Sequence, residues 1–171
     1  MNFGDEVQLV IAAATGAAAW AAWRSARESQ RATQATLFTQ LMSRYNSPEM
    51  SEALREFTRL RERAQPSFTA FAESWARDLA STRPLRDVTE CDRQRRLVAH
   101  FFWLASRLIE DGLITKGLQE ELLELSGARV MRDVVLELEL ALHKAEQSPS
   151  AAAMHRIERF KRVFFPGGRR G

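Results

Sequence analysis

The sequence predicts an all-α protein, and three observations support this fold class. Only eight glycines and five prolines occur among 171 residues, so few positions interrupt a helix. Alanine, leucine, arginine and glutamate, which all favour helices, are abundant along the chain. Apolar residues also recur at helical spacing in most segments after residue 36. Because 45% of the residues are hydrophobic, the chain can bury the core of one domain.

Residues 1–23 form the predicted membrane anchor. No charged residue occurs from Val7 to Trp23, and this run of 17 residues has the shortest length expected of a transmembrane helix. Tryptophans end the run and arginines follow at once, as is typical of a membrane interface: Trp20, Trp23, Arg24, Arg27 and Arg31. Positive charge favours the cytoplasmic side. We therefore expect a single transmembrane helix in the inner (cytoplasmic) membrane, with the lipid bilayer as a partner and the C-terminal domain in the cytoplasm.

Two other interpretations of this segment stay open. A secretory signal peptide would carry basic residues before the apolar run, and residues 1–6 contain none. A buried, alanine-rich helix of a protein without an anchor would also fit, because 17 mildly apolar residues can form a core element. Detergent dependence would separate the anchor from the buried helix.

Small residues within the run predict self-association. Ala12 and Gly16 are four positions apart, a spacing that lets two helix backbones approach closely in lipid. A homo-oligomer is therefore an expected assembly. The alternative is that the alanines are filler, since such pairs arise readily in any alanine-rich run.

The anchor is expected to continue as a helical stalk over residues 24–36 and to enter a helical bundle over residues 37–147. Ser47 can cap a helix that starts at Pro48, and residues 81–90, which contain Pro84, are expected to form a loop. The alternation at residues 136–140 hints at a strand, but the longer apolar spacing around it favours a helix. Helices are predicted over 48–64, 68–79, 92–111, a short segment after Thr115, and 128–144.

Residues 148–171 form the predicted basic amphipathic tail. From Arg156 onward the net charge is +5, which leaves −2 for the rest of the chain, whose total is +3. The predicted contacts of the tail with anionic lipid or a partner are Arg156, Arg159, Lys161, Arg162, Phe160 and Phe164. A final bundle helix that buries its apolar face in the core explains the same spacing equally well.

The order of several motifs resembles a bacterial family of unknown function. An arginine- and threonine-bearing stalk precedes Tyr45, which is followed by Ser47-Pro48-Glu49-Met50; then come Arg95-Arg96, His100-Phe101-Phe102 and Asp111-Gly112-Leu113-Ile114. This resemblance covers most of residues 20–142. It implies an N-terminal membrane anchor, a stalk and a small helical cytoplasmic domain, and it implies no chemistry.

The sequence predicts no catalytic residue, no cofactor and no metal ligand. The three histidines, His100, His143 and His155, lie on separate predicted helices without the spacing of a metal site. The cluster Arg93, Arg95 and Arg96 fits either a solvated first helical turn or a contact with an anion or lipid head group. The single cysteine, Cys91, cannot form an internal disulfide and is expected to pack in the domain.

These features predict a membrane-anchored cytoplasmic interaction or scaffold module rather than an enzyme. Its expected partner, besides the bilayer, is a protein that the sequence does not identify. Two alternatives stay open: an enzyme whose site is dispersed over facing helices, and a nucleic-acid binder that acts through the basic tail. Nucleic acid is not an expected partner of the body, because its net charge is negative.

Overall fold

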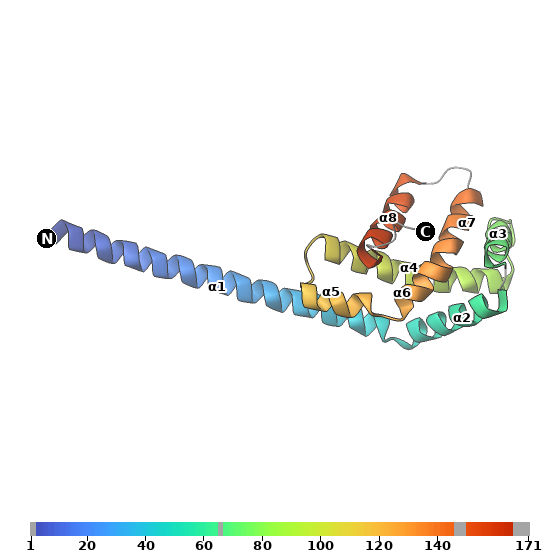
Figure 1. Ribbon diagram of the computed structural model, residues 1–171, viewed down its shortest axis with the longest axis horizontal. Helices are drawn as coiled ribbons and strands as arrows, with labels where there is room; N and C mark the ends of the chain where they lie inside the picture. The colour runs from blue at the N-terminus through green and yellow to red at the C-terminus, as the bar shows by residue number, and fades with distance from the viewer. Residues whose placement is uncertain (1–2, 65–66, 146–149, 166–171) are drawn as a thin grey trace. The chain divides into compact units, whose positions relative to one another are not determined.

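The computed structural model describes residues 3–64, 67–145 and 150–165, with side chains from residue 15 onward. Within these ranges all regular secondary structure is helical and no strand occurs, so the predicted all-α class is confirmed (Figure 1). The chain divides into two compact units, residues 1–37 and residues 38–171. The second unit contains the hydrophobic core.

Helix α1 covers Phe3–Tyr45 without a break, as expected for an anchor that continues into a stalk. Its side chains from residue 15 to residue 33 are exposed. Among the described residues, no helix combines the length and the apolar character that crossing a membrane requires. The membrane-spanning role of residues 1–23 therefore stays a prediction.

Helices α2, Pro48–Ala64, and α3, Phe68–Leu79, have the bounds that the sequence predicts. The start of α2 is capped as expected, because the hydroxyl of Ser47 accepts a hydrogen bond of 3.2 Å from the backbone N–H of Met50. Both helices are amphipathic, and they bury Phe57 and Trp75 in the core.

Helix α4, Arg86–Glu110, begins before the predicted start at residue 92, so the predicted loop is wrong for residues 86–90. Pro84 lies before the helix and does not interrupt it. Asp87 favours the first turn because its charge suits the positive end of the helix dipole. Trp75 holds this turn in place, since its indole N–H donates a 3.3 Å hydrogen bond to the carbonyl of Val88.

The chain then forms α5, Lys116–Leu123, and α6, Gly127–Val130, a π-helical segment η1, Met131–Val135, and α7, Leu136–Ala145. Gly112 ends the preceding helix with a φ of 66°, as its position after α4 predicts. Residues 136–140 are helical, so the preference for helix over strand is confirmed. The sequence gives no signal for η1.

Helix α8, Ala151–Phe164, is the last described helix of the bundle. The expected start at Ser148-Pro149 lies outside the described residues, as do residues 166–171 of the predicted tail. The apolar face of α8 is buried against α4 and contributes Ile157, Phe160, Val163 and Phe164 to the core.

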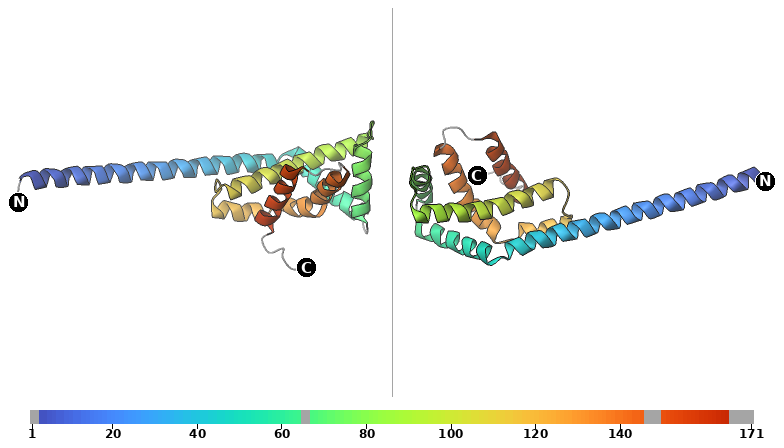
Figure 2. Two further views of the ribbon diagram at one scale, coloured as in Figure 1. Left: turned by 90° about the horizontal axis from the view of Figure 1, so that it is seen from above. Right: turned by 180° about the vertical axis from the view of Figure 1, so that it is seen from behind.

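Helix α4 is the central element of the bundle. It packs against α2, α3, η1 and α8, and the two views of Figure 2 show it crossing the bundle beside these segments. Phe102 of α4 is fully buried and makes edge-to-face contacts with Phe160 and Phe164 of α8. The helix predicted over residues 92–111 thus lies at the centre of the core.

Candidate functional site

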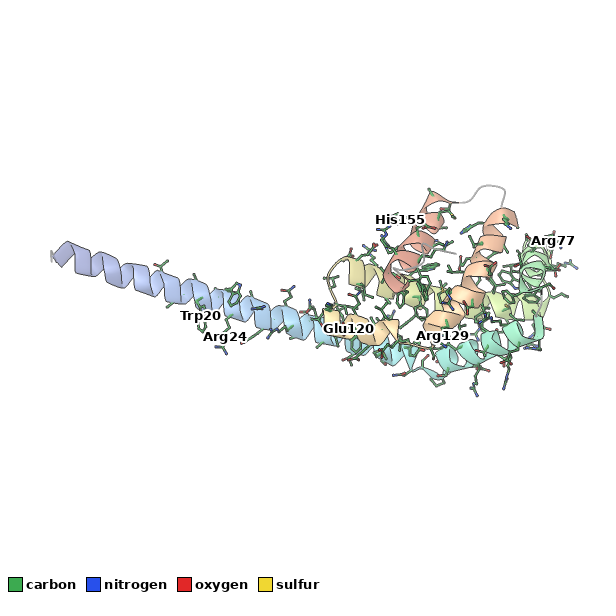
Figure 3. All side chains as sticks on the ribbon, viewed as in Figure 1. Trp20, Arg24, Arg77, Glu120, Arg129 and His155 are labelled. Atoms are coloured by element: carbon green, nitrogen blue, oxygen red, sulfur yellow. The ribbon has the colours of Figure 1, made fainter. Side chains whose placement is uncertain are left out.

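The predicted membrane interface lies on an exposed part of α1. Trp20 and Trp23 are 59% and 57% exposed, the largest aromatic exposure among the described residues (Figure 3). The guanidinium of Arg24 lies 5.6 Å from the centre of the Trp20 ring, and that of Arg27 lies 5.1 Å from the Trp23 ring. Each indole is thus paired with a cation one turn further along the helix, while its ring stays open to solvent.

Three further residues of the first unit are predicted contacts: Arg31 at the membrane interface, and Ala12 and Gly16 for self-association. Arg31 is exposed. A side-chain carbon added at Gly16 would meet nothing within 4 Å, so this position is open on the helix surface. The side chain of Ala12 lies outside the described residues. Self-association through Ala12 and Gly16 stays a prediction.

The structure corrects the prediction for the two phenylalanines of the basic tail. Phe160 is fully buried and Phe164 almost so, which means that their predicted contact with lipid is wrong and that the alternative, a final bundle helix, is correct. Their rings stack at 4.9 Å inside the core. The lipid interpretation failed because an apolar helix face looks the same whether a membrane or a protein core covers it.

The tail cations are divided between internal contacts and solvent. Arg159 and Arg162 both contact Glu110 of α4, at 2.8 Å and 3.2 Å. Lys161 is exposed and lies 3.4 Å from Glu158, and Arg156 is exposed. Contact of these four cations with anionic lipid or a partner stays a prediction, without an apolar face of α8 to support it.

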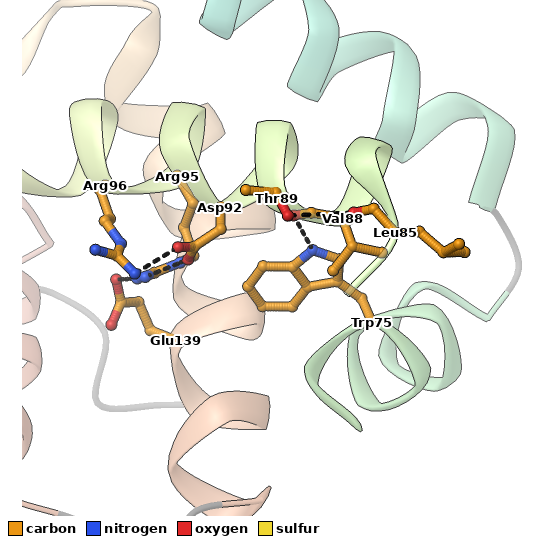
Figure 4. A network of polar contacts seen from close by, with 8 residues as sticks. All are labelled: Trp75, Leu85, Val88, Thr89, Asp92, Arg95, Arg96 and Glu139. Carbon is orange, nitrogen blue, oxygen red and sulfur yellow. Dashed lines mark hydrogen bonds and ion pairs between the residues drawn. The ribbon is translucent and has the colours of Figure 1, made fainter. Parts of the chain in front are cut away.

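The arginine cluster at residues 93–96 contains one buried member. The guanidinium of Arg95 donates to Asp92 at 2.7 Å and 3.0 Å and to Glu139 of α7 (Figure 4). Arg96 is exposed and lies 2.6 Å from the other oxygen of Asp92, while Arg93 pairs with Glu90 at 2.7 Å. Arg93 and Arg96 are therefore solvated, as one of the two interpretations predicts, although α4 begins at Arg86 and they do not lie in its first turn; Arg95 instead ties α4 to α7.

Described residues of α2, α3 and α4 line a pocket of the bundle. Its volume is about 570 Å³, a size typical of ligand-binding clefts. The apolar part of its lining comes from all three helices: Phe57, Leu60, Phe71, Trp75, Val88 and Cys91. Since Leu60, Phe71 and Val88 are only half-buried, apolar surface remains open to an incoming group.

Acidic side chains surround this pocket. Its lining includes five carboxylates and only one guanidinium, that of Arg63; the carboxylates belong to Glu52, Glu56, Asp78, Asp87 and Glu90. Three of the five have a described cationic neighbour: Glu56 pairs with Arg59 at 2.7 Å, Glu90 pairs with Arg93, and Arg93 also interacts electrostatically with Glu52. The bidentate hydrogen bond from Arg93 lowers the pKa of the Glu90 carboxyl, so Glu90 is ionised at neutral pH.

Cys91 borders the pocket and should be an unreactive thiol. Burial raises its pKa to about 11, so little thiolate forms at neutral pH and alkylation should be slow until the protein unfolds. Because the folded pKa is the higher one, the contribution of the thiol to stability is present at neutral pH and lost as the pH rises from the ordinary thiol pKa through about 11. Iodoacetamide labelling followed over pH, with and without denaturant, measures this. Equal rates in both states would contradict it.

The described residues contain no candidate metal site. No group of three or more histidine, cysteine, aspartate or glutamate side chains that could hold a metal ion occurs among the described residues. The three histidines lie on three different helices, as predicted: His100 is exposed on α4, His155 is exposed on α8, and His143 lies on α7.

The sequence contains no signal that predicts the pocket. Its rim residues Glu52, Asp78 and Asp87 are ordinary surface carboxylates in the sequence, and only the packing of three helices brings them around one opening.

Comparison with protein-family models, with curated proteins and with solved structures finds no match. The candidate site is therefore defined by its own geometry.

Proposed function

We propose that the chain is a membrane-anchored interaction module, in which α1 holds a cytoplasmic helical bundle at the bilayer. The observation that supports this most strongly is the exposure of Trp20 and Trp23, which lie at the end of an uncharged run of 17 residues and beside Arg24 and Arg27. Exposed indoles cost free energy in water and are stabilised at a membrane interface, where the ring contacts acyl chains and the adjacent cation contacts head groups.

The second unit supports a binding role rather than an enzymatic one. The pocket between α2, α3 and α4 has an apolar floor and an acidic rim, and among its lining residues no nucleophile is paired with a base. Such a pocket can hold a partner, and its one thiol, that of Cys91, is unreactive because burial raises the thiol pKa. In this proposal α1 spans the inner membrane and concentrates the bundle, and whatever its pocket binds, at the cytoplasmic surface.

The anchor is tested by placing charges in the uncharged run of the full-length chain. Ala14→Lys with Ala17→Lys should release the protein from membranes into the alkaline-wash supernatant, because each lysine at the centre of a span costs about 2.5–3.5 kcal/mol. The matched control is Ala32→Lys with Ala35→Lys, which adds the same charges at the same spacing on exposed stalk positions. The control should stay in the membrane pellet with the unmodified chain.

Topology separates a spanning helix from one that lies on the surface. In a Cys91→Ser background, a cysteine placed by Asn2→Cys should react with a membrane-impermeant maleimide added outside spheroplasts. A cysteine placed by Met154→Cys, which is exposed on α8, should react only after lysis. Extraction of the unmodified chain by alkali would overturn the anchor, and protection of both cysteines would overturn the span.

A further inference from the structure

We propose that the pocket between α2, α3 and α4 is the docking site for a basic peptide segment that carries an apolar side chain between its cations. This inference rests on the proposed function only in expecting a partner, and it names the chemical class of that partner. The pocket lies wholly within residues 38–171, so its chemistry does not depend on how α1 meets a membrane.

The apolar floor requires an apolar group in the ligand. Three half-buried apolar side chains line the pocket, one from each helix: Leu60, Phe71 and Val88. Covering such surface is favourable because it removes apolar area from water. A purely ionic ligand would leave this floor uncovered, and a purely apolar ligand would have to pass and partly desolvate the acidic rim.

The rim requires positive charge in the ligand. Glu52, Asp78 and Asp87 form no hydrogen bond or ion pair among the described residues, although Arg93 interacts electrostatically with Glu52, whereas Glu56 and Glu90 pair directly with arginines. Asp78 is in the last turn of α3, where the negative end of the helix dipole adds to its charge. A negative potential therefore remains at the opening of the pocket after the internal pairs are counted.

The distribution of the carboxylates favours a peptide over a small organic cation. Glu52 is on α2, Asp78 on α3 and Asp87 at the start of α4, so the three charges reach the pocket from three different helices. A ligand with one ammonium group would neutralise one of them. A segment with arginine or lysine on both sides of a leucine or phenylalanine can neutralise several while its apolar side chain covers the floor.

Fluorescence anisotropy of a labelled peptide with full-length protein tests this assignment. The probe is Arg-Leu-Arg-Phe-Arg-Leu-Arg, and two comparison peptides replace either all arginines by glutamate or the apolar residues by serine. We expect salt-sensitive binding of the first peptide only. Glu52→Gln with Asp78→Asn and Asp87→Asn should weaken its binding about tenfold or more, because three rim charges are removed from the contact.

A matched variant separates the pocket from the general charge of the protein. Glu120→Gln with Glu121→Gln and Glu124→Gln removes the same charge from exposed positions of α5 and its C-terminal cap, none of which lines the pocket. This variant should bind the probe within about twofold of the unmodified chain. Circular dichroism checks that both triple variants stay folded. Phe71→Ser tests the floor without a change of charge and should also weaken binding.

Three results would overturn the docking site: no binding of the arginine probe, equal binding of the serine peptide, or equal weakening by the two triple variants. These results are distinguishable from failure of the membrane anchor. Peptide binding is measured on protein in solution or detergent and reports on α2, α3 and α4, whereas the lysine substitutions at residues 14 and 17 report on α1. Either experiment can fail while the other succeeds.

Discussion

Phe160→Ala should lower the free energy of unfolding by about 3–5 kcal/mol, the range found when a buried phenylalanine is truncated. Phe160 is fully buried and its ring contacts four other aromatic rings, with centroid distances of 4.9 Å to Phe164, 5.8 Å to Phe102, 6.1 Å to Trp103 and 5.7 Å to Phe165. Removing it leaves a cavity where α8 meets α4, which rigid neighbouring rings cannot close. Urea unfolding followed by circular dichroism measures the loss as a shift of the midpoint.

Met154→Ala is the matched control on the same helix. Met154 is 36% exposed, so its truncation removes less buried surface and should cost under about 1 kcal/mol. Vesicle binding by the full-length chain should be unchanged by Phe160→Ala, because the ring is inside the bundle and cannot contact lipid. Reduced vesicle binding with unchanged stability would contradict the buried position and restore the lipid interpretation of the tail.

Several helices could be predicted from local signals alone. The bounds of α2 and α3 follow from residues that stop or start a helix by themselves, such as Ser47, Pro48 and the Gln65-Pro66-Ser67 segment between them. The start of α4 cannot be placed in this way, because Pro84 predicts a loop over residues 81–90, whereas the helix begins at Arg86, two residues after the proline. Tertiary packing of Trp75 against Val88 supports the additional turn, and periodicity carries no signal for that contact.

The functional surfaces were harder to predict than the helices, for two physical reasons. The apolar face of α8 has the same spacing whether it covers a core or a membrane, so Phe160 and Phe164 could not be assigned from the sequence. The pocket depends on Glu52, Asp78 and Asp87 meeting around one opening, and their separation along the chain says nothing about that meeting. Trp20 and Trp23 stand at the end of an uncharged run and are exposed, but their contact with a membrane stays a prediction.

The sequence alone does not distinguish a buried arginine from an exposed one, as Arg95 and Arg96 show. They are adjacent, identical in type and on one helix, yet Arg95 is buried and the Arg96 side chain is 72% exposed. Arg95 bridges Asp92 of its own helix and Glu139 of α7, with its guanidinium 5.9 Å from the Trp75 ring centre (Figure 4). Helical spacing places Arg95 on the inner face, but only its carboxylate partners make a charge tolerable there.

Arg95→Met should therefore lower the free energy of unfolding by about 3–5 kcal/mol, as expected when one member of a buried ion pair is removed. Glu139 is buried and has no other described ion-pair partner, so its carboxylate would stay in the core without a counter-charge. Asp92 would keep its contact with Arg96. Urea unfolding measures the loss, and Arg96→Met serves as the adjacent control, with an expected cost under about 1 kcal/mol because that pair is largely solvated.

A double variant separates the cost of an unpaired charge from the loss of the arginine side chain itself. Arg95→Met with Glu139→Leu removes both charges and leaves apolar side chains of similar size, an exchange that is often neutral or stabilising for buried pairs. The double variant should therefore be more stable than Arg95→Met alone, by about 2 kcal/mol or more. If Arg95→Met and Arg96→Met cost the same, or if the second substitution brings no recovery, Arg95 does not act as the buried link between α4 and α7.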